Sequence, residues 1–126
     1  MKKRIEGYIP RAIELINEVH IANNGIVKNE FNGYFSSFGA AIIQSGLKPA
    51  LAFFSNTKSD AAANRAKILT AIYVLIIGGG SEGVTPKMLI EYVIDHPNDE
   101  EVLKAKIVDA SIALKLAVRT FKIEKS

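Results

Sequence analysis

The sequence predicts an all-α fold, a compact single-domain bundle of five or six helices that spans residues 1–126. Apolar residues recur every three or four positions along nearly the whole chain, which is the spacing of one helix face. Glycine, asparagine and proline divide the chain into segments of helical length, and no segment keeps the alternation of a strand. The 126 residues, 48% of them hydrophobic, suffice for one packed core.

The first segment is predicted to be a helix that ends at the sequence Asn23-Asn24-Gly25. Ile9, Ile13 and Ile16 lie on one side of it. Pro10 either occupies the first turn of a helix that begins near Ile9 or kinks a longer helix. Asparagine and glycine accept the left-handed conformation that ends helices, so the helix is expected to stop there.

The next segment predicts two helices joined at a glycine. The first runs from about residue 28 to 45, and Phe31, Phe35 and Phe38 are spaced as part of its core stripe. These rings could also stack on nucleic-acid bases, but their spacing favours the core. Gly46 is expected to end this helix, and Pro49 suits the first position of a short helix over residues 50–54.

Three further helices follow. Ser59 or Asp60 is expected to cap a helix that reaches Ile77. The glycine-rich residues 78–83 form a flexible loop, and Thr85-Pro86 begins a helix that stops at residues 95–97. The pair of Asn98 and Glu101 has capping-box spacing for a last helix that carries the remaining basic residues.

The residues that would support an enzyme or a metal site are not grouped in this sequence. The glycines at 78–80 lack the Gly-Lys-Ser or Gly-Lys-Thr of a phosphate loop, and no strand pattern precedes them. His20 and His96 are the two histidines, far apart in the chain, and there is no cysteine. We therefore expect no catalytic residues, no metal and no cofactor.

The last helix carries a basic stripe beside its apolar face. At about 100° per residue, three of its bases fall close to one line and two lie about 60° to either side. Such a stripe could follow RNA phosphates, although long basic side chains also cover core edges and favour helix C-termini. The bases are Lys104, Lys115, Arg119, Lys122 and Lys125.

Three bases outside that helix are also candidate contacts. Arg65 falls on the same face as the apolar Leu69 and Ile72, so it either lies beyond the rim of the core or contacts a subunit or a phosphate. Lys67 is expected to point away from that face into solvent. Lys48 lies at the glycine joint, where it is a plausible contact.

Residues 44–54, with the sequence QSGLKPALAFF, resemble the signature of the small helical subunit of the type III-B CRISPR effector, the Cmr complex. In that family a helix ends in Asn- or Ser-Gly-Leu and a Leu-Ala-Phe helix follows. Tyr34 and the pair Ile42-Ile43 match an aromatic and an aliphatic pair upstream. Residues 68–75 resemble the next helix without its frequent tryptophan.

One departure from the family pattern affects the expected RNA contacts. Relatives often carry lysines on the outer face of the helix before the signature. This chain has Ser36, Ser37, Gly39 and Ala40 there. Any RNA contact made by those lysines is therefore missing or moved, and the basic last helix is a candidate replacement.

The resemblance implies a non-catalytic, RNA-binding subunit of a CRISPR-associated antiviral-defence ribonucleoprotein. It implies backbone and large subunits, guide and target RNA, and further copies of the chain as partners, with target cleavage left to a backbone subunit. The candidate RNA or subunit contacts are Lys48, Arg65, Lys67, Lys104, Lys115, Arg119 and Lys122.

The composition leaves one alternative open and indicates a compartment. The chain could instead be a small helical adaptor or regulator that binds protein without RNA. A net charge of +3 does not require an RNA partner, because ordinary solvent-exposed surfaces carry similar charge. The absence of cysteine fits the cytoplasm. The basic start lacks an apolar signal core, and the run from Ala71 to Ile77 is too short to span a bilayer, so no membrane association is expected.

Overall fold

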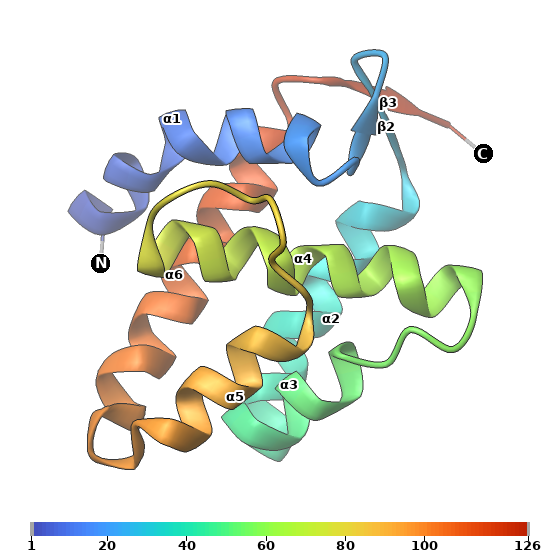
Figure 1. Ribbon diagram of the computed structural model, residues 1–126. Coiled ribbons are helices and arrows are strands. Elements are labelled where there is room, and N and C mark those ends of the chain that lie inside the picture. The colour runs from blue at the N-terminus through green and yellow to red at the C-terminus, as the bar shows by residue number, and fades with distance from the viewer. Residues whose placement is uncertain (1, 126) are drawn as a thin grey trace.

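The helical spacing of the sequence produces six α-helices in the computed structural model, which describes residues 2–125 (Figure 1). A single 3₁₀ turn, η1 (Pro97–Asp99), precedes the last of them. The prediction of an all-α bundle of five or six helices is confirmed, apart from a small three-stranded sheet described below. The helices are α1 (Lys2–Glu18), α2 (Glu30–Ser45), α3 (Leu47–Phe54), α4 (Asp60–Ile77), α5 (Lys87–Asp95) and α6 (Glu100–Val118).

Helix α6 lies at the centre of the packing. Helices α1, α2 and α4 all contact it, and Ile107, Ala110 and Leu114 on its inner face are fully buried. The aromatic stripe of α2 enters the same core, as predicted. The ring of Phe38 meets that of Phe54 from α3 edge to face, with 5.1 Å between centroids. The two segments that flank Gly46 therefore share one core.

The N-terminal helix is the longer of the two alternatives, because α1 contains Pro10 in its interior. The prediction that it ends at Asn23-Asn24-Gly25 is wrong. It ends at Glu18, and Asn24 and Gly25, with φ of 55° and 78°, form the turn of a hairpin between β1 (Ala22–Asn23) and β2 (Ile26–Lys28). An Asn-Gly pair with both φ values positive suits a two-residue hairpin, since its twist matches that of the strands.

A small sheet is the feature that the sequence pattern did not predict. Strand β3 (Lys122–Glu124) pairs in parallel with β2, which gives the order β1-β2-β3. Figure 1 shows this C-terminal segment beside the hairpin that follows α1. The predicted extension of the last helix through Lys122 and Lys125 is therefore wrong, because α6 ends at Val118.

The joint between α2 and α3 is a glycine turn. Gly46 has φ 94° and ψ 167°, and its N–H donates to the carbonyl oxygen of Ile42 at 3.0 Å. This confirms Gly46 as the end of α2. Pro49 is the third residue of α3 rather than its first, because that helix begins at Leu47.

Two predicted helix caps have different outcomes. The hydroxyl of Ser59 accepts a hydrogen bond from the backbone N–H of Ala62 at 3.1 Å, which confirms it as the cap of α4. The capping box of Asn98 and Glu101 does not form. Asp99 holds the N-cap position of α6 without a side-chain cap bond, because residues 97–99 form η1.

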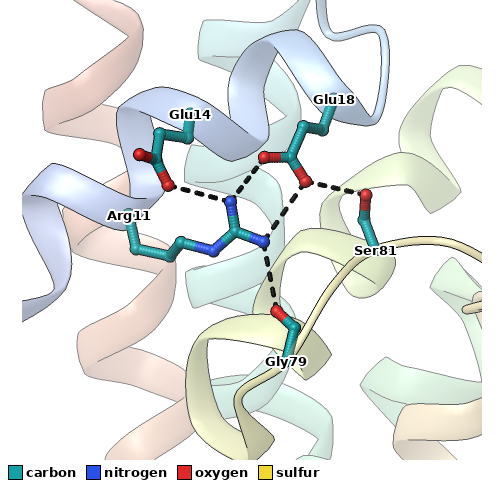
Figure 2. Close-up of polar contacts among 5 residues, drawn as sticks. All are labelled: Arg11, Glu14, Glu18, Gly79 and Ser81. Atoms are coloured by element: carbon teal, nitrogen blue, oxygen red, sulfur yellow. Dashed lines mark hydrogen bonds and ion pairs between the residues drawn. The ribbon is translucent and has the colours of Figure 1, made fainter.

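A polar network holds the glycine-rich loop against α1 (Figure 2). The guanidinium of Arg11 donates to Glu14, to Glu18 and, at 3.1 Å, to the carbonyl oxygen of Gly79. The hydroxyl of Ser81 donates to Glu18 at 2.9 Å. The hydrogen bonds from Arg11 and Ser81 lower the pKa of Glu18, and the bond to Glu18 raises the pKa of Arg11. The loop follows helix α4, so the strand that a phosphate loop requires does not precede it.

Within residues 2–125, none of the helices combines the length and the apolar character needed to cross a membrane.

Candidate nucleic-acid interface

The seven predicted contact residues come from three helices and the segment that follows α6. Their surroundings differ, and each group is described below. Lys48 lies on α3, Arg65 and Lys67 on α4, Lys104 and Lys115 on α6, Arg119 just after α6 and Lys122 on β3.

Arg65 stacks on the aromatic side chains of α3. Its guanidinium carbon lies 4.6 Å from the ring centroid of Phe53 and 5.6 Å from that of Phe54. Phe53 is 58% exposed, whereas Phe54 is buried. The Nε atom of Arg65 is buried and has no hydrogen-bond partner among residues 2–125. A guanidinium stacked on a ring keeps its in-plane donors available for a phosphate or a carboxylate.

The phenol of Tyr34 lies in the electrostatic field of Arg65. Its hydroxyl donates to the carboxylate of Glu30 at 2.8 Å. Burial and this hydrogen bond raise the pKa of Tyr34, and the positive charge of Arg65 opposes them. Arg65 therefore has an aromatic surface on one side and a carboxylate-bonded phenol nearby.

The prediction that Lys67 points away into solvent is wrong. It is half-buried, and its Nζ atom donates to the backbone carbonyl oxygen of His20 at 3.0 Å. His20 follows the end of α1 with φ 63°, so a cation meets the negative end of that helix. Burial, with a smaller effect of the nearby Lys28, lowers the pKa of Lys67. This lysine joins α4 to the C-terminal end of α1.

Lys48 forms an ion pair that links α3 to the start of α6. Its Nζ atom lies 3.1 Å from a carboxylate oxygen of Glu100, the first residue of α6. The lysine side chain is 46% exposed, so the pair contributes about 0–1 kcal/mol to stability. Because the pair is weak, a phosphate or another carboxylate could replace Glu100 at this lysine.

The predicted stripe is reduced to two lysines on α6, Lys104 and Lys115, since Lys122 and Lys125 lie beyond the helix. The Nζ atom of Lys115 donates to the hydroxyl of Ser36 on α2 at 2.9 Å. Ser36 is one of the positions where the resembled family often has lysines. Helix α6 thus brings an ammonium group to the outer face of α2, where the sequence of α2 itself lacks a base.

Both lysines line an apolar groove of about 300 Å³ between α2 and α6, which we call the α2–α6 groove. Side chains of both helices form it, and no carboxylate is among its lining residues. From α2 come Phe35, Ser36, Gly39, Ile42 and Ile43. From α6 come Lys104, Val108, Ser111, Ile112 and Lys115.

The small sheet presents a second basic surface. Lys28 and Lys122 are exposed on β2 and β3, and alternation puts them on the face opposite the buried Val27. Arg119 is exposed just before β3, and neither it nor Lys122 forms an ion pair with another of residues 2–125. Glu124 shares this face and offsets one charge. Sequence reasoning missed Lys28, because three-residue strands are too short for alternation to identify them.

The two histidines have local roles. The ring of His96 stacks on that of Tyr92 with 4.0 Å between centroids, and its Nδ1 atom lies 2.8 Å from the carbonyl oxygen of Tyr92. His20 lies after the end of α1, as described above. No group of three or more acidic, histidine or cysteine side chains within residues 2–125 is placed to hold a metal ion.

Comparison with protein families gives a match over most of the chain. The model of a CRISPR-associated protein family, Cas_Cmr5, matches residues 5–114. The chain belongs to the Cas_Cmr5 family. This confirms the resemblance drawn from residues 44–54 to the small subunit of the type III-B effector complexes. No curated protein and no solved structure matched the chain in the same comparisons.

The Cas_Cmr5 match divides the candidate contacts into two groups. It includes Lys48, Arg65, Lys67 and Lys104, and it ends one residue before Lys115. The α2–α6 groove thus lies almost entirely inside the matched region, whereas Arg119, Lys122 and the rest of β3 lie outside it. Membership makes the chain a CRISPR-associated subunit of a Cmr complex.

Proposed function

We propose that the chain is a non-catalytic subunit of an RNA-guided antiviral effector ribonucleoprotein of type III-B. In this proposal it packs on the backbone and large subunits, and on further copies of itself, beside the guide–target duplex in the cytoplasm. There it supports the binding of target RNA. The observation that carries the proposal is the Cas_Cmr5 match over residues 5–114. Spread positive charge suffices for such a role, since a duplex is held through its backbone and shape.

Arg119 and Lys122 are the bases that best fit an RNA contact. Both are exposed and unpaired by other described side chains, on a surface that also carries Lys28. Lys67 is the weakest candidate, because its ammonium already binds the carbonyl oxygen of His20. Arg65, Lys48, Lys104 and Lys115 remain candidates for contacts with RNA or with a neighbouring subunit.

Native purification tests the assembly. A tagged chain expressed in its own host is expected to co-purify with several larger subunits and a small guide RNA. Recovery of the chain with a discrete protein partner and no RNA would favour the adaptor hypothesis instead. Recovery of the chain alone at low salt would contradict both.

A salt series tests the RNA contact in the assembled complex. The double variant Arg119→Glu and Lys122→Glu is expected to weaken target-RNA binding and to reduce the slope of log affinity against log salt by roughly one to two. Lys58→Glu with Lys87→Glu, at two exposed lysines, is the control with the same change in net charge. An unchanged slope in the double variant would remove this surface from the proposal.

A further inference from the structure

The α2–α6 groove is open at the molecular surface and has room above its floor. A Cβ atom added at Gly39 would meet no heavy atom within 4 Å, so the space beside α2 is empty of this chain's own side chains. Ser36 and Gly39 on α2 are small, so that side of the groove is not filled. Small residues of this kind allow a second helix to approach closely.

The rim of the groove exposes apolar surface to solvent. Ile43 is 85% exposed, the largest exposed fraction of any large hydrophobic side chain among residues 2–125. Ile112, across the groove on α6, is 40% exposed, and Leu116 one turn further along is 38% exposed. Ile43 and Ile112 line the same groove, and exposed apolar side chains gathered in one groove are typical of a surface that binds another molecule.

The charges of the groove limit what that molecule can be. Lys104 and Lys115 are eleven residues apart on α6, which is about three turns or roughly 16 Å. The ammonium of Lys115 bonds to a neutral hydroxyl, and Lys104 has no ion pair with another described residue. An apolar floor with a cation toward each end is complementary to an apolar surface that carries a carboxylate at each end.

We propose that the α2–α6 groove binds an amphipathic helix of another protein subunit. The helix places two or three apolar side chains over Gly39, Ile43 and Ile112 and sets carboxylates about 16 Å apart against Lys104 and Lys115. The inference rests on the proposed function, because it names one docking surface of that assembly. An RNA strand is the less suitable occupant, since its phosphates would meet an apolar floor and leave Ile43 uncovered.

Photo-crosslinking from position 43 tests the occupant. A benzoylphenylalanine at this exposed position, in the complex purified from its host, is expected to crosslink to one segment of another subunit. That segment must combine apolar residues at helical spacing with acidic residues about eleven positions apart. Crosslinking to RNA, to a segment without this pattern, or to nothing in an assembled complex would overturn the groove proposal.

Binding of a synthetic peptide with the crosslinked sequence completes the test. Full-length chain is expected to bind it, and Ile43→Glu is expected to weaken binding about tenfold or more. Gly39→Leu, which fills the groove without a charge change, should do the same, as should Lys104→Glu with Lys115→Glu. Ile94→Glu, at a 54% exposed isoleucine on α5, is the matched control and should leave affinity unchanged. Equal affinity in wild type and Ile43→Glu would contradict the proposal.

The two proposals fail in different ways. If the wild-type chain purifies without other subunits, the proposed function itself is wrong. If the complex assembles with its guide RNA while the crosslink or the peptide fails, only the groove proposal is overturned.

Discussion

An Nη1 atom of Arg4, in the first turn of α1, lies 2.9 Å from Oδ2 of Asp109 in the middle of α6. The aspartate side chain is 9% exposed and the arginine side chain 32%. The pair therefore joins the two helices that pack together most extensively, at a position where the carboxylate is almost out of water. The phenol of Tyr8 shares these surroundings. Burial raises its pKa, the charge of Arg4 opposes this, and the charge of Asp109 adds a smaller increase.

Removal of the arginine should destabilise the fold. Arg4→Ala takes a charged donor from a buried carboxylate and is expected to lower the free energy of unfolding by about 1–3 kcal/mol. Denaturant unfolding measures the change. Lys3→Ala, at the exposed neighbouring residue, is the control and should shift stability by less than about 0.5 kcal/mol. Equal effects of the two changes would mean that the ion pair contributes nothing.

Two glycines, one directly after α2 and one inside it, give predictions of opposite sign. Gly46, with φ 94° and ψ 167°, occupies a region that other residues rarely adopt, so Gly46→Ala should cost about 1–3 kcal/mol. Gly33 lies inside α2 with open space around it, so Gly33→Ala should stabilise by up to about 1 kcal/mol. Thermal unfolding of the two variants checks both signs. A stabilised Gly46→Ala would refute the strain argument.

The contact of Arg65 with α3 predicts an energetic coupling. In a double-mutant cycle, Arg65→Ala and Phe53→Ala should show about 0.5–1 kcal/mol of interaction energy in unfolding experiments. The pair Arg65→Ala and Ile94→Ala, in which α5 provides the second residue, is the control and should be additive. Additivity in the Phe53 cycle would show that the stacking has no energetic value.

The network of Arg11 and Glu18 predicts a pH dependence. The pKa of Glu18 is lower in the folded chain, so the network stabilises the fold above the unfolded pKa of glutamate and is lost as the pH falls through the folded pKa. At about pH 6, Glu18→Gln should therefore be less stable than wild type by less than about 1 kcal/mol, because the network is exposed.

Unfolding measured at about pH 6 and about pH 3 tests this pH dependence. The difference between wild type and Glu18→Gln should disappear at the lower pH. Glu6→Gln, an exposed glutamate of the same helix outside the network, should show no such trend. A difference that persists in acid would contradict the role of the Glu18 carboxylate.

Much of the fold could be predicted from the sequence because local signals and packing agree there. The aromatic stripe of α2, the glycine at residue 46 and the cap at Ser59 depend on neighbours a few residues away, and all three were predicted correctly. The β3 strand depends on a partner near the other end of the chain, so periodicity within Lys122–Glu124 carried no signal. The Asn24-Gly25 turn was misassigned because the same residues end helices and close hairpins.

The candidate site was less accessible to sequence reasoning for a similar reason. A helical wheel extended past Val118 placed Lys122 and Lys125 beside Lys115, although the chain turns away after α6. The α2–α6 groove needs two helices from distant parts of the sequence. In the sequence, the small residues of α2 are distinguished only by the lack of lysines, and they contribute to a groove because α6 lies beside them.

The parallel pairing of β2 with β3 also bears on the order in which the fold assembles. Val27 and Ile123 are about a hundred residues apart, so their contact closes a loop that contains α2 to α6. Closing so long a loop is entropically costly unless the intervening helices have already packed. The β2–β3 pairing is thus expected to form late, after the helices have packed. Weakening this pairing would speed unfolding while leaving the folding rate nearly unchanged.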